Sequence, residues 1–176
     1  MNFIEEIQDN AITKLRFTSE DEYAIDNVRL LIDAIKKNSS IVAVEFLDDF
    51  MGCVRNDSRS ELLQALVQIP CLQELCVEDG LIQIADIAKV LCGLPGLKAL
   101  TLRKIVLQGI EEDFNACEMA LHQHCSLKEF VLEGCQPAVP GISIDTLELA
   151  GKKQASGALA GSIQTSSPSP ASARTA

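Results

Sequence analysis

An apolar frame that recurs along the chain places the strongest constraint on its fold. The frame reads apolar-x-x-apolar-x-apolar, and two regular copies of it lie 25 residues apart. These copies are Leu72, Leu75, Val77 and Leu97, Leu100, Leu102. Self-similarity at such a period is typical of a chain built from one repeated unit of secondary structure. We therefore expect a repeat architecture, whose extent is set by the remaining copies of the frame.

Four further copies of the frame extend the array in both directions. The central residues of successive copies are separated by 29, 31, 25, 30 and 17 residues. Each of the first four intervals has room for a strand, a turn, a helix and a loop that leads back to the next strand. The last interval contains Pro137, Pro140 and Gly141, which predict an irregular loop. The four copies are Ile12, Leu15 and Phe17; Ile41, Val44 and Phe46; Leu127, Phe130 and Leu132; and Ile144, Leu147 and Leu149, the weakest.

Each copy of the frame predicts a short strand, and apolar residues at helical spacing predict a helix before the next copy. Strands joined by helices in this way run parallel, and right-handed crossovers stack the units in chain order. Because a helix is wider than the roughly 4.8 Å between strands, the stack must curve with its strands inside. We therefore predict an α/β solenoid, a right-handed β-α superhelix of about five to six repeats. Its parallel β-sheet lies on the concave face and its helices on the convex face.

A doubly wound α/β domain with five or six parallel strands is the alternative fold. The buried strands of such a domain read as continuous Val and Ile runs, whereas polar residues interrupt the strands expected here. The expected organisation is an N-terminal capping helix over residues 1–10, a repeat domain over 11–150 and a tail over 151–176. The tail is rich in Ser, Pro and Ala and has no periodic apolar pattern, so we expect it to be disordered.

The alternation of Leu-x-x-Leu-x-Leu units with helices every 25–31 residues resembles the leucine-rich repeats. Units of this length resemble the ribonuclease-inhibitor-like class of that family, which includes the Ran GTPase-activating proteins. The resemblance covers about residues 11–150 and implies a binding scaffold, because this class mostly serves that role. The family usually places Asn or Cys eight residues after the first Leu of a unit, where Cys135 fits. The other units hold Glu20, Asp49, Gly80, Ile105 and Lys152 there, so irregular turns are expected.

Residues that alternate with the frame are predicted to face the concave side of the sheet. Six acidic and three basic side chains fall in these positions. Arg103 is expected between Glu78 and Glu133, where it would bridge both, while Glu74 and Glu129 lie about 10 Å apart with no base between them. The alternative interpretation is a solvated strand face whose charges keep the chain soluble. The expected partner-binding residues are Glu45, Glu74, Cys76, Glu78, Thr101, Arg103, Glu129, Val131 and Glu133.

The charge of the chain restricts the class of partner. The net charge is −10, and residues 1–150 keep 12 of the 15 basic residues and all 25 acidic ones, which gives −13. Such a field repels phosphate backbones, so no nucleic-acid partner is expected. The expected partner is a basic or mixed-charge protein segment, and the chain itself is expected to be a monomer.

The N-terminus and the cysteines indicate a compartment. Residues 1–6 are acidic and contain no long apolar run, which does not fit a signal peptide. No stretch approaches the roughly 18 apolar residues of a membrane span. The seven cysteines are odd in number and form no C-x-x-C pair, which favours a reducing setting. We expect an intracellular protein, cytoplasmic or nuclear, without a membrane partner.

The sequence offers few groups for catalysis or for a cofactor. His122, His124 and Cys125 lie within four residues, but a structural zinc requires a fourth ligand. Cys76 is expected beside Glu74 and Glu78, which disfavour the thiolate that a reactive cysteine needs. No phosphate-binding loop, dinucleotide fingerprint or serine-hydrolase elbow is present. We therefore expect no catalytic residues, no cofactor and no bound metal.

These patterns support three functional hypotheses. The first is a non-catalytic protein–protein interaction scaffold that binds its partner through the acidic concave face. The second follows the resemblance: a regulator of an enzyme, GTPase-activator-like or inhibitor-like, with Arg16 and Arg55 as candidate residues. The third is a structural fragment of a longer repeat array, because terminal repeats need protected outer faces.

Overall fold

The computed structural model describes residues 3–160, and the side chains of residues 4–152. One six-stranded sheet runs through this part of the chain, with β1 to β5 in sequence order and a short β6 beside β4. Every neighbouring pair of strands is parallel. The strands are β1 (Lys14–Phe17), β2 (Ala43–Phe46), β3 (Glu74–Gln83), β4 (Ala99–Gln108), β5 (Glu129–Glu133) and β6 (Gln136–Pro137).

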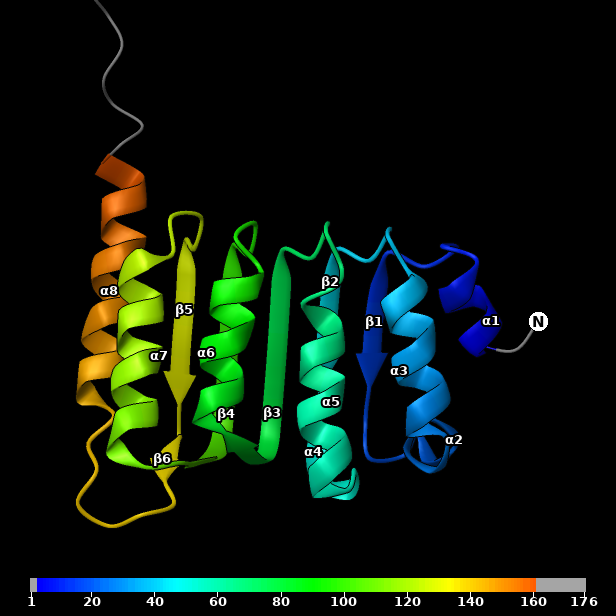
Figure 1. Ribbon diagram of the computed structural model, residues 1–176, viewed down its shortest axis with the longest axis horizontal. Helices are drawn as coiled ribbons and strands as arrows, with labels where there is room; N and C mark the ends of the chain where they lie inside the picture. The colour runs from blue at the N-terminus through cyan, green and yellow to red at the C-terminus, as the bar shows by residue number, and fades with distance from the viewer. Residues whose placement is uncertain (1–2, 161–176) are drawn as a thin grey trace, which may run out of the picture.

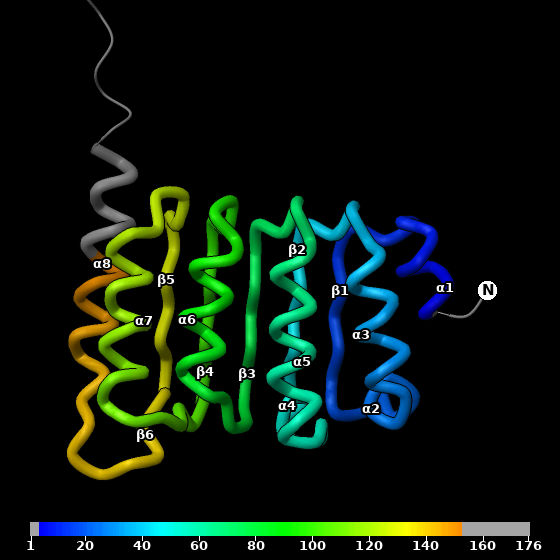
Figure 2. Tube along the Cα trace, in the orientation of Figure 1, coloured from blue at the N-terminus to red at the C-terminus, as the bar shows by residue number. Residues whose placement is uncertain are grey.

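The helices cover one face of this sheet (Figure 1). They are α1 (Phe3–Gln8), α2 (Glu22–Asp26), α3 (Val28–Lys37), α4 (Phe50–Cys53), α5 (Asn56–Leu66), α6 (Ile84–Gly93), α7 (Glu111–Gln123) and α8 (Asp145–Ala160). The longer helices pack side by side in chain order, from α3 through α5, α6 and α7 to α8. Figure 2 shows each strand-and-helix unit beside the units that precede and follow it. A doubly wound domain has helices on both faces of its sheet, so the described residues do not form one.

The apolar frame sets the register of the sheet. Leu15, Val44, Leu75, Leu100 and Phe130 stand opposite one another in neighbouring strands, as the frame predicts. On the first four strands the frame residues are at most 1 % exposed, because they face the helices. Side chains alternate along a strand, so the residues between them lie on the side of the sheet without helices.

Three of the seven aromatic residues stack at the N-terminal end of the core. Phe17, Phe46 and Phe50 stack with ring centroids 5.2–5.8 Å apart, and all three are buried. Aromatic pairs of this kind add about 0.5–1.5 kcal/mol beyond the burial of their area. The stack therefore helps to hold β1, a four-residue edge strand with β2 as its neighbour.

The C-terminal end of the array differs from its prediction. The weakest copy of the frame, expected to be a sixth strand, leads into α8 instead. Ile144, Leu147 and Ala150 are spaced by three residues, which suits a helix as well as the frame. Leu147 and Ala150 are each 1 % exposed in this helix, whereas Leu149 is 58 % exposed. Gly151 lies on the same face, where a Cβ would come within 2.0 Å of Phe130 Cδ1, so α8 sits close against β5.

Helix α8 also covers residues 151–160, where a disordered tail was expected to begin. The helix packs against both β5 and α7, and it thereby closes the C-terminal edge of the sheet. Residues 161–176 lie outside the described residues, so disorder there stays a prediction.

His124 holds the turn that leads from α7 back into the sheet. The side chain is 5 % exposed, and its Nδ1 accepts a hydrogen bond of 3.1 Å from the Leu127 amide. Its Nε2 lies 2.9 Å from the carbonyl oxygen of Leu94. Leu94 follows α6, the helix of the preceding unit. These two partners require a neutral ring with the proton on Nε2. The histidine thus links two successive units through their backbones.

Asn38 plays the same part in the turn after α3. It is 2 % exposed, and its side-chain oxygen accepts a hydrogen bond of 2.9 Å from the Ile41 amide. Its side-chain nitrogen donates to the Ile7 carbonyl at 2.5 Å, which ties α1 to the following unit. Buried polar side chains in these turns therefore serve the stacking of units.

We predict that His124→Ala destabilises the fold by about 2 kcal/mol, because it leaves a buried N–H and a buried carbonyl without their side-chain partner. His122→Ala is the matched control, since that side chain is 45 % exposed and lies 3.6 Å from Glu118. An exposed substitution of this kind usually changes stability by less than about 0.5 kcal/mol. Urea unfolding followed by circular dichroism measures both values, and equal losses would contradict the role given to His124.

Candidate functional site

The side of the sheet opposite the helices, here called the helix-free face, presents three rows of side chains across the strands. All nine residues predicted to bind a partner lie in these rows, although their role in binding stays a prediction. The residues expected from a sixth strand do not join the face, because they belong to α8. The rows are Lys14, Ala43, Glu74, Ala99 and Glu129; Arg16, Glu45, Cys76, Thr101 and Val131; and Glu78, Arg103 and Glu133.

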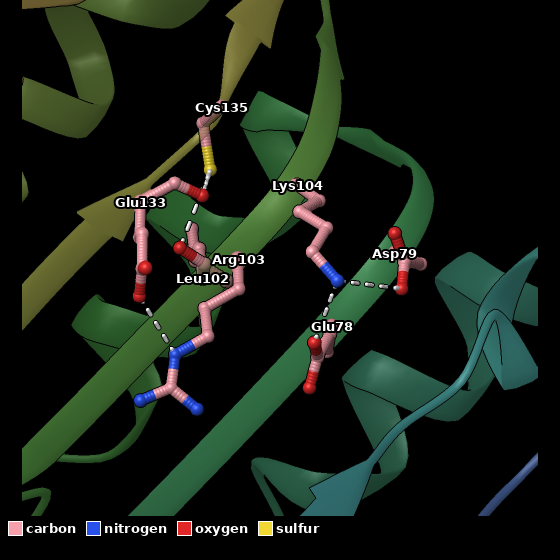
Figure 3. Close-up of polar contacts among 7 residues, drawn as sticks. All are labelled: Glu78, Asp79, Leu102, Arg103, Lys104, Glu133 and Cys135. Atoms are coloured by element: carbon pink, nitrogen blue, oxygen red, sulfur yellow. Dashed lines mark hydrogen bonds and ion pairs between the residues drawn. The ribbon is translucent and has the colours of Figure 1, made fainter.

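Arg103 pairs with one of its two predicted partners (Figure 3). Its Nε lies 3.1 Å from Glu133 Oε2, between β4 and β5. Glu78 pairs instead with Lys104, whose Nζ lies 3.1 Å from Glu78 Oε1 and 3.7 Å from Asp79 Oδ2. The hydrogen bond that Lys104 donates to Glu78 and the nearby charge of Asp79 raise the pKa of Lys104. Exposed pairs of this kind add little to stability, but they neutralise one end of the face.

The backbone at Lys104 explains why sequence reasoning missed this residue. Strict alternation after Arg103 would direct Lys104 toward the helices. Its φ is 51°, a left-handed conformation that breaks the alternation and leaves the side chain exposed. Asp79, at the matching place in β3, has a φ of 60°. The available signal was a lysine at a position that strict alternation would bury, since lysine is almost never fully buried unless paired.

Two carboxylates of the first row have no ion-pair partner among the described residues. Glu74 and Glu129 flank Ala99 in register, two strand spacings or roughly 10 Å apart. Glu45 in the next row is paired, with Lys14 Nζ at 2.7 Å. A hollow of about 280 Å³ lies over this region, with the two unpaired carboxylates and the small Ala99 in its lining. The hollow therefore offers a place for a cationic side chain.

Cys76 lies in the middle of the helix-free face and is partly buried. Burial is the main cause that raises the pKa of its thiol. Arg103 opposes that effect, while Glu45 and Glu78 add to it. The thiol is thus protonated at neutral pH, which is unfavourable for a nucleophile. Sequence reasoning gave the correct direction of the pKa shift, but it attributed the shift to carboxylates and missed burial as the main cause.

The three soft-ligand candidates near residue 124 do not converge on one point. His124 is engaged by backbone groups, His122 lies 3.6 Å from Glu118, and Cys125 Sγ lies 3.4 Å from the Gln123 carbonyl oxygen. Within residues 4–152, no three His, Cys, Asp or Glu side chains form a group suited to hold a metal ion.

The two arginines of the enzyme-regulator hypothesis also lie apart. Arg16 is exposed on the helix-free face of β1. Arg55 is exposed immediately before α5, in the helix layer. The two arginines therefore belong to different layers of the fold.

The turn ladder expected from the family resemblance is present at one of its predicted positions. The Cys135 thiol donates a hydrogen bond of 3.3 Å to the Leu102 carbonyl of the preceding unit (Figure 3). Burial raises the pKa of this thiol, so it keeps the proton that the bond requires. The matching positions in β3 and β4 hold Gly80 and Ile105, which have no side-chain donor. The described turns are therefore not held by a continuous ladder.

Comparisons with known proteins place the fold. No family model matches the sequence, and no curated protein matches it. A solved structure of actin-binding site 2 of leiomodin-1 matches with a TM-score of 0.62 at 13% identity, covering 90% of this chain and 88% of that chain. The tropomodulin C-terminal domain of Caenorhabditis elegans matches with a TM-score of 0.59 at 15% identity, covering 89% of each chain. At these identities the likeness shows the fold alone.

These matches correct the family assignment made from the sequence. The structures found are domains of leiomodin and tropomodulin, so the assignment to ribonuclease-inhibitor-like leucine-rich-repeat proteins was wrong. The apolar frame specifies parallel strands alternating with helices, but it does not distinguish families that share this alternation. The interrupted turn ladder and the helix α8 in place of a sixth strand are the features in which this chain departs from the assigned class.

Cys76 is predicted to react slowly with iodoacetamide at neutral pH, because its raised pKa leaves little thiolate. Its rate should keep rising above pH ~8.5, where an ordinary thiol is half ionised. Glu78→Gln removes a charge that raises the pKa and should speed the reaction, whereas Arg103→Gln should slow it. Mass spectrometry of the alkylated peptides measures the rates, with exposed Cys53 as internal control. Identical rates in both variants would refute the electrostatic part of this description.

Ala99→Lys is predicted to place an ammonium group between Glu74 and Glu129 and to raise stability by about 0.5 kcal/mol. Ala99→Gln is the control, with a side chain of similar length and no charge. The gain of the lysine variant over the control should fade at high salt, because exposed pairs are screened. Thermal unfolding at low and high salt measures the difference. If the two variants melt together at low salt, the carboxylates do not share one cation.

Proposed function

We propose that this chain is a non-catalytic protein-binding module whose helix-free face contacts the partner. One observation carries the proposal: within residues 3–160 no helix covers this face across β1 to β5, while the helices pack on the other side (Figure 1). The apolar frame residues of the strands are buried against the helices. The residues that alternate with them are mostly polar, and the register of the sheet holds them in fixed positions on the helix-free face. A preorganised array of this kind loses little conformational freedom on binding.

Actin is the first candidate partner. One of the domains with a similar fold, from leiomodin-1, is named as an actin-binding site. This candidate rests on fold-level analogy, since the identity is 13%. The shallow hollow over the helix-free face suits the side chains of a protein surface.

The finer part of the proposal is that the partner contributes a basic segment. Glu74 and Glu129 are the unpaired carboxylates in the first row of the helix-free face, and the chain carries a net charge of −10. Complementary charge mainly gives specificity and a faster association rate. The nine predicted residues of the face form the contact in this proposal, and an inward curvature of the sheet belongs to it as well.

An intracellular, cytoplasmic location goes with such a partner and is part of the same proposal. It is supported by seven cysteines without a C-x-x-C pair. In the part of the chain that the structure describes, no helix combines the length and apolarity that crossing a membrane requires.

The double variant Glu74→Lys/Glu129→Lys is predicted to weaken binding of purified actin by at least about tenfold, or 1.4 kcal/mol, because two attractive contacts become repulsive. Monomeric and filamentous actin are tested separately, the first by sedimentation velocity and the second by co-sedimentation. Binding of the unmodified chain should weaken as salt is raised, since the attraction is electrostatic.

Asp33→Lys/Glu61→Lys is the matched control, with the same change in net charge on the exposed surface of α3 and α5. This control should retain the affinity of the unmodified chain. An equal loss in both double variants would indicate a general charge effect and remove the helix-free face from the interface. Absence of binding to either form of actin would remove actin as the partner.

A further inference from the structure

The spacing of the unpaired carboxylates on the helix-free face restricts what can bind them. Glu74 is the first residue of β3 and Glu129 the first residue of β5, and Ala99 stands between them at the start of β4. The line that joins the two carboxylates therefore runs across the strands, and two strand spacings give it a length of roughly 9.6 Å. A partner that pairs with both must present two cationic side chains this far apart on one side of its backbone.

An α-helix meets this requirement, whereas an extended chain does not. Residues i and i+7 of a helix are separated by a rise of roughly 10.5 Å and by only about 20° around the axis, so they lie on one side. In an extended chain the residues on one side are i, i+2 and i+4, which are separated by roughly 6.6 and 13.2 Å. Both of these separations differ from the carboxylate spacing by at least about 3 Å.

A polyproline helix matches the distance but not the shape of the face. Its residues i and i+3 lie on one side, roughly 9.3 Å apart, while the two residues between them point away. The helix-free face has a hollow of about 280 Å³, with the small side chain of Ala99 in its lining between the two carboxylates. In an α-helix, residues i+3 and i+4 lie between i and i+7 on nearly the same side, so one of them can fill this hollow.

We propose that the helix-free face binds an α-helical segment of its protein partner, which lies across β3, β4 and β5 with cationic residues i and i+7 on Glu74 and Glu129. The inference rests on the proposed function, because it describes the partner of the same face. Thr101 lies roughly 6.6 Å further along β4 than Ala99. Thr101 and Cys76 are partly buried and also line the hollow. The residue of the bound helix that lies between its two cations is therefore apolar or small.

The basic side chains near the hollow leave the two carboxylates available. Lys14 is engaged by Glu45, with 2.7 Å between Nζ and Oε1. Lys98 and Lys128 immediately precede β4 and β5 and are exposed. Within residues 4–152, no basic side chain forms an ion pair with either carboxylate of the first row. The cations of a partner helix therefore displace no existing pair, and complementary charge selects a basic helix over an acidic one.

Two designed peptides of identical composition test the spacing. Both are Ala- and Gln-rich helices of about 20 residues, long enough to be helical in water. One carries arginines at positions i and i+7, and the other carries them at i and i+5, which lie roughly 140° apart around the axis. The first peptide should bind the full chain at least about fivefold more tightly, since only it reaches both carboxylates at once. An NMR titration of the isotope-labelled chain measures both affinities, and the amides of Ala99 and Thr101 should shift most.

Variants of the chain locate the effect. Glu74→Gln/Glu129→Gln should abolish the difference between the two peptides, because it removes both charges and keeps the length of both side chains. Asp33→Asn/Glu61→Gln makes the same change of charge at exposed positions of α3 and α5, so it should preserve the difference. Circular dichroism and melting temperature show that each variant is folded.

The outcomes separate this inference from the proposed function. Equal affinities of the two peptides, no binding of either, or a difference that survives in Glu74→Gln/Glu129→Gln would each overturn the helical partner. If actin binding depends on the two carboxylates while the peptides bind alike, the proposed function stands and the helical partner falls. If the first peptide binds as expected and actin does not bind, the helical partner stands and actin falls.

Discussion

Burial of one side of a parallel sheet is the constraint on which the rest of this structure depends. The frame residues of β1 to β4 are at most 1 % exposed, and the strands hold them in one register. A slip of one residue would turn the frame toward water and the intervening charges toward the helices. The same register that fills the core therefore aligns Glu74, Ala99 and Glu129 on the other side. Fold and candidate site follow from one pattern.

Much of this arrangement could be predicted, because it depends on period alone. Strand order, the register of the frame and the nine residues of the helix-free face all follow from alternation along strands and helical spacing between them. The sixth strand was wrong because Ile144, Leu147 and Ala150 fit both periods, and packing against Phe130 decided for a helix. The family was wrong because turns, not the apolar frame, separate proteins that share this alternation.

The ion pairs show where periodicity stops being sufficient. The Arg103–Glu133 pair required knowledge of register only, whereas the pairing of Glu78 depended on a positive φ at Lys104. A backbone conformation of that kind has no periodic signal. The register of the strands alone places Ala99 between the carboxylates of Glu74 and Glu129. This placement does not depend on the conformation of the neighbouring turns. The unpaired carboxylates are thus the more predictable part of the face, and the neutralised end is the less predictable part.

The order of the strands has a consequence for how this chain matures. Each of the strands β2 to β5 pairs with the strand synthesised just before it, so these strands need no partner from a later part of the chain. The longest pairing, between β3 and β4, aligns nine residue pairs and can form before the residues that follow β4 have emerged. Helix α8 comes last and covers the growing edge at β5. Until α8 has formed, the exposed edge of β5 can pair with a strand of another nascent chain that is translated from the same messenger RNA.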